Sequence, residues 1–368
     1  MKTANYLKYG KRVFFSGNAS PLYLIFFVTS RCNCRCAHCF YWKELNKHVK
    51  EELSPEEIKK ISESMEPLAF LALTGGEPFL RKDLPEIAKI FYENNAVRDF
   101  NIPTNGFSTV QIVESAKKIA ADCQEAQIGI GISVDEVGKL HDRLRGAKGA
   151  FERAIKTFSQ LKEAKKDFPN ISVSFILNVN SFNQERLGEI LSFLESKEPD
   201  FIFSTLTRGS PKDPNTANLD ILQYEKHYAR LTKYNSGRLV SENAVVDALV
   251  RAKIALGAEI EAKTFKEKKF QGIYCNASDK IGVLFPNGDV APCELLGEKI
   301  GNIREFGYDF KALWNSWKNR ELRKKIRGSK CFCTHECFLS SSILFNPRHW
   351  PMLFIKAAEL KLKGREKN

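Results

Sequence analysis

Short apolar runs recur along residues 21–212 and alternate with longer amphipathic segments. The runs begin near residues 22, 69, 99, 128, 171 and 201, and the first reads Leu22-Tyr-Leu-Ile-Phe-Phe-Val28. Short, nearly continuous apolar runs are typical of strands that are buried on both faces of a parallel sheet. Their alternation with helical patterns predicts six β/α units and therefore an α/β fold.

Two helix starts carry local signals. Ser54-Pro55-Glu56-Glu57 offers an N-cap serine, a proline at the first helical position and an acid that completes a capping box. The segment Asp83-Leu-Pro-Glu86 repeats this arrangement. Amphipathic runs follow both signals, over Ile58 to Met65 and Ile87 to Tyr92, so we expect a helix at each place.

The pattern changes after about residue 212, where Pro211 to Pro214 predicts an exit turn. A charged helical stretch follows, and then a cysteine-rich region in which the Asn287-Gly288 pair, between two apolar runs, predicts a β-hairpin. We therefore expect five parts: an N-terminal arm (1–20), the β/α unit (21–212), a helical connector (213–270), a small cysteine-rich domain (271–338) and a basic amphipathic tail (339–368).

Cysteine usage is the strongest chemical signal. Cys32, Cys36 and Cys39 lie in Thr29-Ser-Arg-Cys-Asn-Cys-Arg-Cys-Ala-His-Cys-Phe40, directly after the first expected strand. Thiolates are the soft ligands of iron-sulfur clusters, and a cubane held by three of them keeps one iron open for chemistry. Spacing alone leaves zinc as an alternative, with Cys34 as a fourth thiolate. We interpret Cys34 as a loop residue.

This segment resembles the signature of radical S-adenosylmethionine (SAM) enzymes, in which an aromatic residue follows the cysteines, here Phe40 and Tyr41. Four later segments resemble that family in the same order: Gly75-Gly-Glu-Pro78, Thr104-Asn-Gly106, Ser133-Val-Asp135 and His141-Asp-x-x-Arg145. The resemblance implies a [4Fe-4S] cluster whose open iron binds SAM. One electron then cleaves SAM to methionine and a 5'-deoxyadenosyl radical, which abstracts a substrate hydrogen.

The resemblance also implies an open (β/α)6 partial barrel and assigns roles within it. Gly75, Gly76 and Glu77 hold the SAM amino group, while Ser133 and Arg145 hold its carboxylate, which suits a guanidinium fork. His141 and Asp142 are interpreted as a local hydrogen-bonding pair, and Thr207 and Arg208 receive no role. Further cofactor-binding residues are expected at the same mouth of the barrel: Tyr41, Thr104, Asn105 and Asn178.

Five cysteines in the C-terminal region resemble the SPASM and shorter twitch extensions of radical SAM enzymes, which bind auxiliary iron-sulfur clusters. A full SPASM domain with two clusters uses seven cysteines, so five imply one cluster, expected to be [4Fe-4S]. Cys337 is the preferred third ligand, zinc stays an alternative, and His335 and Cys123 are interpreted as structural. The expected ligands are Cys275, Cys293 and two or three of Cys331, Cys333 and Cys337.

Composition limits the setting. No secretion signal or membrane-spanning run is present in the sequence, and ten cysteines then indicate a reducing cytoplasm. The net charge is +13, and the segment Asn346 to Arg365 mixes aromatic, aliphatic and basic residues. That mixture suits an interfacial helix at a membrane surface, although packing against the barrel is the simpler interpretation. Nucleic acid is not expected, because no basic-aromatic recognition module is visible.

Two classes of function remain. The first is a radical SAM enzyme that modifies a peptide or protein, or a small molecule such as a sugar, nucleotide or lipid-linked compound, with a reductase or flavodoxin-type electron donor. The second is a non-catalytic zinc or iron-sulfur scaffold. The Gly75–Pro78 segment, Ser133 and Arg145 favour the enzyme, because a scaffold needs no SAM cradle. About 20 residues precede the first strand, too few for a fused leader-recognition domain. This weakens the peptide-maturase interpretation without removing it, because a maturase can use a separate recognition protein.

Overall fold

The computed structural model describes residues 9–10, 12–14, 19–47, 49–236, 238 and 243–365, so most of the expected arm and the last three residues of the tail lie outside the described part. Six parallel strands stand side by side in chain order, which confirms the α/β prediction. These strands are β1 (Tyr23–Thr29), β2 (Phe70–Gly75), β3 (Asp99–Thr104), β4 (Gln127–Ser133), β5 (Ile171–Val179) and β6 (Ile202–Leu206).

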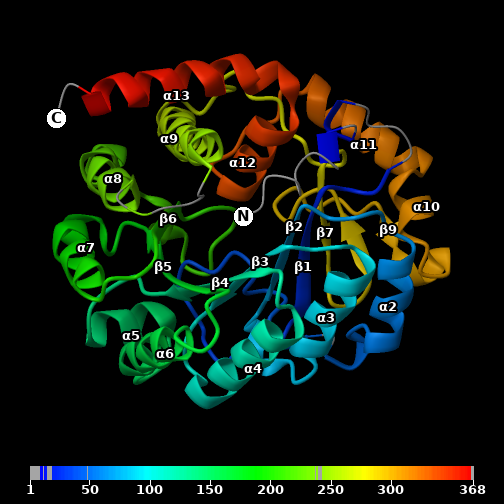
Figure 1. Ribbon diagram of the computed structural model, residues 1–368, viewed down its shortest axis with the longest axis horizontal. Coiled ribbons are helices and arrows are strands. Elements are labelled where there is room, and N and C mark those ends of the chain that lie inside the picture. Colours follow the sequence, from blue (N-terminus) through cyan, green and yellow to red (C-terminus); the bar gives the residue numbers. More distant parts are fainter. Residues whose placement is uncertain are drawn as a thin grey trace.

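Helices connect the strands and cover the outer side of the curved sheet, as Figure 1 shows. The main core lies between the two layers and includes the fully buried Phe26, Ile130 and Phe175. The connecting helices are α2 (Pro55–Glu63), α3 (Leu84–Asn94), α4 (Thr109–Asp122), α5 (Lys139–Arg145), α6 (Ala150–Ala164) and α7 (Leu187–Ser196). The carboxyl ends of all six strands therefore open toward one mouth, as the expected partial barrel requires.

The two expected helix starts differ in detail. Ser54 caps α2, and its reciprocal capping box with Glu57 is present as predicted. Helix α3 begins at Leu84 as expected, but Asp83 makes no cap hydrogen bond, so the prediction of a second capping box is wrong. The reason is that the Arg81 guanidinium donates hydrogen bonds to both Asp83 carboxylate oxygens at 2.9 Å. Arg81 also donates to the Val28 carbonyl.

The C-terminal hairpin joins the barrel sheet, an arrangement that the sequence did not indicate. Strand β7 (Ile281–Leu284) pairs parallel with β1, and β8 (Asp289–Ala291) and β9 (Gly301–Asn302) add antiparallel strands, for nine strands in one sheet. The predicted turn at Asn287-Gly288 is confirmed, with Gly288 at a φ of 87°. Strand β1 therefore lies between the SAM-type motifs and the cysteine-rich region.

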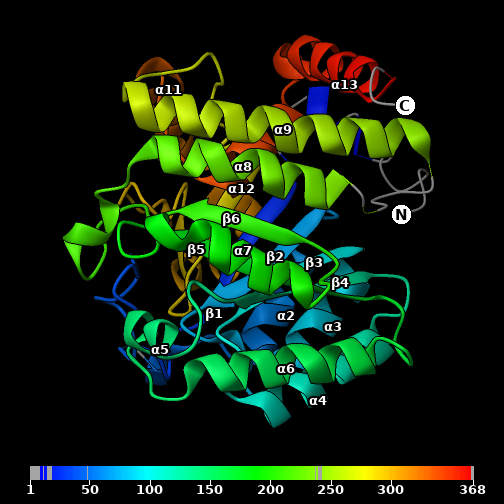
Figure 2. The ribbon, with the colours of Figure 1, turned by 90° about the vertical axis from the view of Figure 1, so that its left-hand side faces the viewer.

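The remaining helices stand beside and above β6 and β7, where Figure 2 shows α8, α9 and α13 stacked at one side of the sheet. No helix in the described residues has the length and apolar character needed to cross a bilayer. These helices are α8 (Ile221–Ser236), α9 (Ala244–Glu267), α10 (Phe310–Trp314), α11 (Trp317–Gly328), α12 (Glu336–Phe345) and α13 (Trp350–Arg365). Short 3-10 turns lie at Val49–Glu51, Pro78–Leu80, Gln184–Arg186, Pro214–Ala217, Ile303–Phe306 and Pro347–His349.

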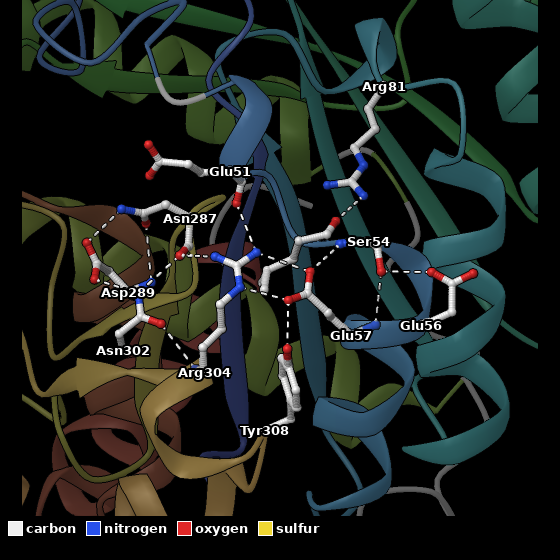
Figure 3. Close-up of polar contacts among 11 residues, drawn as sticks. Glu51, Ser54, Glu56, Glu57, Arg81, Asn287, Asp289, Asn302, Arg304 and Tyr308 are labelled. Carbon is white, nitrogen blue, oxygen red and sulfur yellow. Dashed lines mark hydrogen bonds and ion pairs between the residues drawn. The ribbon is translucent and has the colours of Figure 1, made fainter.

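One polar network ties the hairpin region to the barrel, and Figure 3 shows it in close-up. Glu57, the capping-box acid of α2, accepts from Arg304 at 2.7 Å and from the Tyr308 hydroxyl at 3.0 Å. Arg304 also donates to the backbone carbonyls of Glu51 and Asn287. A single carboxylate therefore caps a barrel helix and also binds the C-terminal region.

We predict that Glu57→Ala lowers the free energy of unfolding by about 1–2 kcal/mol, because it removes a helix cap and a part-buried ion pair together. Glu56→Ala, a matched change one residue away on the exposed side, should stay within about 0.5 kcal/mol. Urea denaturation of both variants measures the difference. Equal midpoints would contradict the proposed tie between the two regions.

The same carboxylate has a pH signature. Hydrogen bonding to Arg304 lowers the pKa of Glu57 from 4.5 to about 2. The ion pair and hydrogen bonds of Glu57 therefore stabilise the folded protein fully above the pKa of this carboxyl in the unfolded chain. That contribution is lost as the pH falls from about 4.5 through 2.

Candidate active site

The cysteine loop after β1 is held by very close backbone contacts to the end of β2. The amide of Gly76 donates to the Thr29 carbonyl at 2.9 Å, and that of Glu77 donates to the Arg31 carbonyl at 2.7 Å. A Cβ atom on Gly75 or Gly76 would lie 2.2 Å from one of these carbonyl oxygens, and Gly75 also has a φ of 134°. Only glycine fits at both places.

The other side of the loop rests on the end of α5. The amide of Arg35 donates to the Arg145 carbonyl, and that of Ala37 donates to the Leu144 carbonyl, both at 2.9 Å. Gly146, with a φ of 61°, ends the helix, and a Cβ there would lie 2.7 Å from the Arg35 carbonyl. Two motifs that are distant in sequence thus clamp the cysteine loop from both sides.

A cavity of about 240 Å³ opens at this place, at the carboxyl ends of the strands. It contains every residue that the sequence suggested for the first site, and it also includes Cys34, whose amide donates to Cys32 Sγ at 3.4 Å. The lining residues from that set are Cys32, Cys36, Cys39, Tyr41, Gly75, Gly76, Glu77, Thr104, Asn105, Ser133, Arg145 and Asn178.

Glu77 organises the wall of this cavity. Its carboxylate is 1% exposed and accepts from the Thr104 hydroxyl at 2.8 Å and from the amides of Asn105 and Phe79 at 2.7 and 3.2 Å. Burial raises the pKa of Glu77 to about 7 against these hydrogen bonds. A cationic group placed in the cavity would compensate the desolvated carboxylate.

Arg145 is oriented by a buried acid whose role the sequence did not reveal. Its guanidinium lies 2.7 Å from Asp135, which is fully buried, and 3.7 Å from Cys36 Sγ. Burial opposes the charge of Asp135, but Arg145 and the neighbouring histidines outweigh it and lower the pKa of Asp135. The Nε atom of Arg145 is buried and has no partner among the described residues.

His141 and Asp142 serve the local structure, as interpreted from the sequence. The Asp135 amide donates to His141 Nδ1 at 3.2 Å, and the Asp142 carboxylate accepts from the amides of Gly149 and Phe151. These bonds hold the loop that carries Asp135 and the start of α6. Neither side chain lines the cavity.

The thiols of the first site suit a cluster that carries positive charge. Burial raises the pKa of Cys32 to about 11 and that of Cys39 to about 12, and it raises the pKa of Cys36 as well. Thiols with such values stay protonated until a metal supplies the compensating charge. The three thiols therefore line one cavity beside the buried Glu77 and Arg145. This set of groups fits an iron-sulfur cluster with an adjoining ligand.

The five C-terminal cysteines gather beside β1 and β7, on the face of β1 that carries Ile25 and Phe27. Cys275, Cys331 and Cys333 line one small pocket, and Cys293 packs in the same apolar cluster as Cys275 and Cys331. Cys337 packs at the edge of this cluster, where the Tyr23 hydroxyl donates to its Sγ at 3.5 Å. All five are free thiols in this structure, which fits metal coordination.

Arg208 connects the two cysteine sites, and the sequence gave it only a strand-end position. It lines the first cavity with its guanidinium 5.3 Å from the centre of the Phe40 ring. Its nitrogens lie 3.3 Å from Glu294, next to Cys293, and 2.7 Å from Glu336, next to Cys337. No short sequence motif could have revealed these contacts of Arg208, because Phe40, Glu294 and Glu336 come from distant parts of the chain.

Comparison with known proteins agrees with this geometry. Residues 26–194 match the radical SAM superfamily, and residues 275–338 match the SPASM iron-sulfur cluster-binding domain. The chain is 30% identical to pre-heme d1 synthase of Dinoroseobacter shibae over 343 residues, which cover 86% of this chain and 79% of that protein.

Two other relatives point to different substrates. The Fe-coproporphyrin III synthase of Methanosarcina barkeri is 31% identical over 50% of this chain, and the match spans only 43% of that protein. The sporulation killing factor maturation protein SkfB of Bacillus subtilis is 25% identical over 85% of this chain and 69% of its own length.

Among solved structures, anSMEcpe with bound AdoMet has a TM-score of 0.59 at 17% identity and covers 94% of this chain and 98% of its own. At this identity the likeness establishes the fold alone. The family matches set aside the non-catalytic zinc or iron-sulfur scaffold. The chain belongs to the radical SAM superfamily: it is an enzyme with a [4Fe-4S] cluster that binds SAM and a SPASM domain for an auxiliary iron-sulfur cluster.

Proposed function

We propose that Cys32, Cys36 and Cys39 hold the SAM-binding cluster and that the wall of the same cavity holds SAM. The observation that carries this proposal is the single cavity, which joins the three thiols to Glu77 and Arg145. When bound, the cluster supplies the electron that splits SAM into methionine and a 5'-deoxyadenosyl radical. That radical then takes a hydrogen atom from the substrate and leaves as 5'-deoxyadenosine.

The residues of the cavity wall position SAM for this step. The desolvated carboxylate of Glu77 accepts hydrogen bonds from the ammonium group, which removes the cost of burying an unpaired charge. Arg145, fixed by Asp135, presents its unpartnered Nε and its remaining N–H donors to the carboxylate. Ser133 lines the same wall and binds the SAM carboxylate together with Arg145. Asn178 and Tyr41 line the remaining wall and bind the nucleoside.

For the auxiliary cluster we propose Cys275 and Cys293 with two or three of Cys331, Cys333 and Cys337. The common apolar cluster and pocket support this set. Arg208 lies between this site and Phe40, which follows Cys39. It acts as a positioning residue that fixes the distance between the two cluster sites.

We propose a peptide as the substrate. Arg208, the arginine of the cavity wall that does not bind SAM, already faces two acids, the buried Glu294 side chain and the partly exposed Glu336. A wall with compensated cations suits neutral amides better than a molecule with several carboxylates, such as a tetrapyrrole. The similarity to the sporulation killing factor maturation protein SkfB supports the same choice. A small molecule is the second candidate, supported by the pre-heme d1 synthase match.

We also propose an acidic flavodoxin-type protein as electron donor. Exposed cations surround the cysteine loop, namely Arg35, Lys43 and Lys212, and the indole of Trp42 is 37% exposed beside them. A positive rim around a redox centre favours encounter with an acidic partner.

The basic C-terminal tail is a further proposed contact, with a membrane surface.

The triple variant Cys32→Ala, Cys36→Ala, Cys39→Ala should release no 5'-deoxyadenosine from SAM after anaerobic reconstitution and reduction. It should still retain about four irons of about eight, because the auxiliary ligands remain. Chromatography of the nucleoside and iron analysis measure both. Cys123→Ala, a buried thiol outside both sites, is the matched control. Nucleoside release by the triple variant at the parent rate would refute the cluster assignment.

Arg145→Lys should weaken SAM binding by about tenfold or more, because an ammonium group replaces a planar fork that is held against Asp135. Arg143→Lys makes the same change two residues away on the exposed side of α5 and should bind SAM like the parent. Titration calorimetry on anaerobic reconstituted protein gives both dissociation constants. Unchanged affinity in Arg145→Lys would exclude the residue as a SAM ligand.

The substrate class has its own test. A low-molecular-mass cell extract should raise 5'-deoxyadenosine release by the reconstituted enzyme above its basal rate. Protease treatment of the extract, followed by removal of the protease, should abolish that increase if the substrate is a peptide. An increase that survives the treatment would favour the small-molecule candidate instead.

A further inference from the structure

The C-terminal helix α13 exposes an apolar face that neither the barrel nor the cluster sites use. Its inner face packs on α9 and α12, where Leu353 is buried against Leu256 and Ile343. Lys356 pairs with Glu259 and fixes the same face. Figures 1 and 2 show α13 along the edge of the molecule, beyond α9.

The outer face of α13 carries residues at the spacing of one helical stripe. Pro351, Ile355, Ala358 and Leu362 are all exposed and lie at i, i+4, i+7 and i+11. Ile355 and Leu362 are 61% and 60% exposed, and Phe354 beside them is 54% exposed. This stripe, Pro351 to Leu362, is about 16 Å long at 1.5 Å per residue.

An aromatic pair lies at the start of α13, and the sequence of this segment is basic. Phe14, which is 57% exposed, packs edge-on against Trp350 at 5.3 Å, at the start of α13. Residues 346–365 carry five cations (Arg348, Lys356, Lys361, Lys363 and Arg365) and one acid (Glu359), so 5 − 1 gives a local charge of +4 within a chain of +13. Aromatic and aliphatic groups among cations are the composition of helices that lie in a membrane interface.

Charge decides between the occupants of this face. A second copy of the chain would bring another charge of +13 and repel the first. An anionic lipid surface attracts cations near it by about 1 kcal/mol each. Because α13 is already folded against α9, its outer face can enter the interface without the cost of forming a helix.

We propose that the outer face of α13 docks the enzyme on an anionic phospholipid surface. Ile355, Leu362 and Phe354 enter the headgroup region, and the exposed Arg348 and Lys361 face the lipid phosphates. The radical reaction does not require this contact, so the two proposals stand or fall separately.

The full-length chain should co-sediment with vesicles of phosphatidylglycerol and phosphatidylcholine and much less with phosphatidylcholine alone. The double variant Ile355→Glu, Leu362→Glu should lose at least about tenfold in vesicle partition, because it places two charges on the inserting face. Val110→Glu, which adds an acid at a 75% exposed valine on α4, is the matched control and should bind like the parent.

Folding and activity controls keep the result unambiguous. Both variants change exposed residues, so their thermal unfolding and their 5'-deoxyadenosine release without vesicles should match the parent. Equal pelleting of parent and double variant, or equal binding to neutral and anionic vesicles, would overturn the proposal. A dimer of the parent in sedimentation velocity that the double variant dissociates, without vesicle binding, would overturn it in favour of a second copy.

Discussion

The contact on which the site depends is the approach of the β2 end to the cysteine loop. Backbone amides of Gly76 and Glu77 reach carbonyls of Thr29 and Arg31, and a Cβ at Gly75 or Gly76 would lie 2.2 Å from an oxygen. Two hydrogen bonds are a modest stabilisation, but any larger residue there would push the loop away. The thiols would then leave the wall that carries Glu77, so this sterically required pair of glycines determines whether the cavity exists.

Buried charges then shape what the cavity can bind. Among the described residues Glu77 has hydrogen-bond donors but no ion-pair partner, whereas Arg145 is paired with Asp135. Glu77, at one end of the cavity, therefore favours a positively charged group. Arg145, at the other end, offers guanidinium N–H donors. A zwitterionic group such as the amino acid part of SAM satisfies both ends at once.

Local sequence signals predicted strands, a helix start and a turn, whereas contacts between distant segments determined the remaining features of the fold and the site. The buried runs, the Ser54 cap and the Asn287-Gly288 turn each depend on neighbouring residues, so the sequence alone was enough. The addition of β7 to β1, the capture of Asp83 by Arg81 and the partners of Arg208 each depend on segments far apart in the chain. The motif residues were found through family resemblance, but Asp135 was missed as a positioning group because its partner was known only as a SAM ligand.

The central claim is that a cluster on Cys32, Cys36 and Cys39 touches SAM directly. Electron paramagnetic resonance of the reduced protein tests it most directly, in a variant whose Cys275 and Cys293 are replaced by alanine so that only the first cluster contributes. We expect the cluster signal to change its g values when SAM is added, because the amino acid part of SAM binds the open iron. A cluster spectrum that is identical with and without saturating SAM would contradict the account.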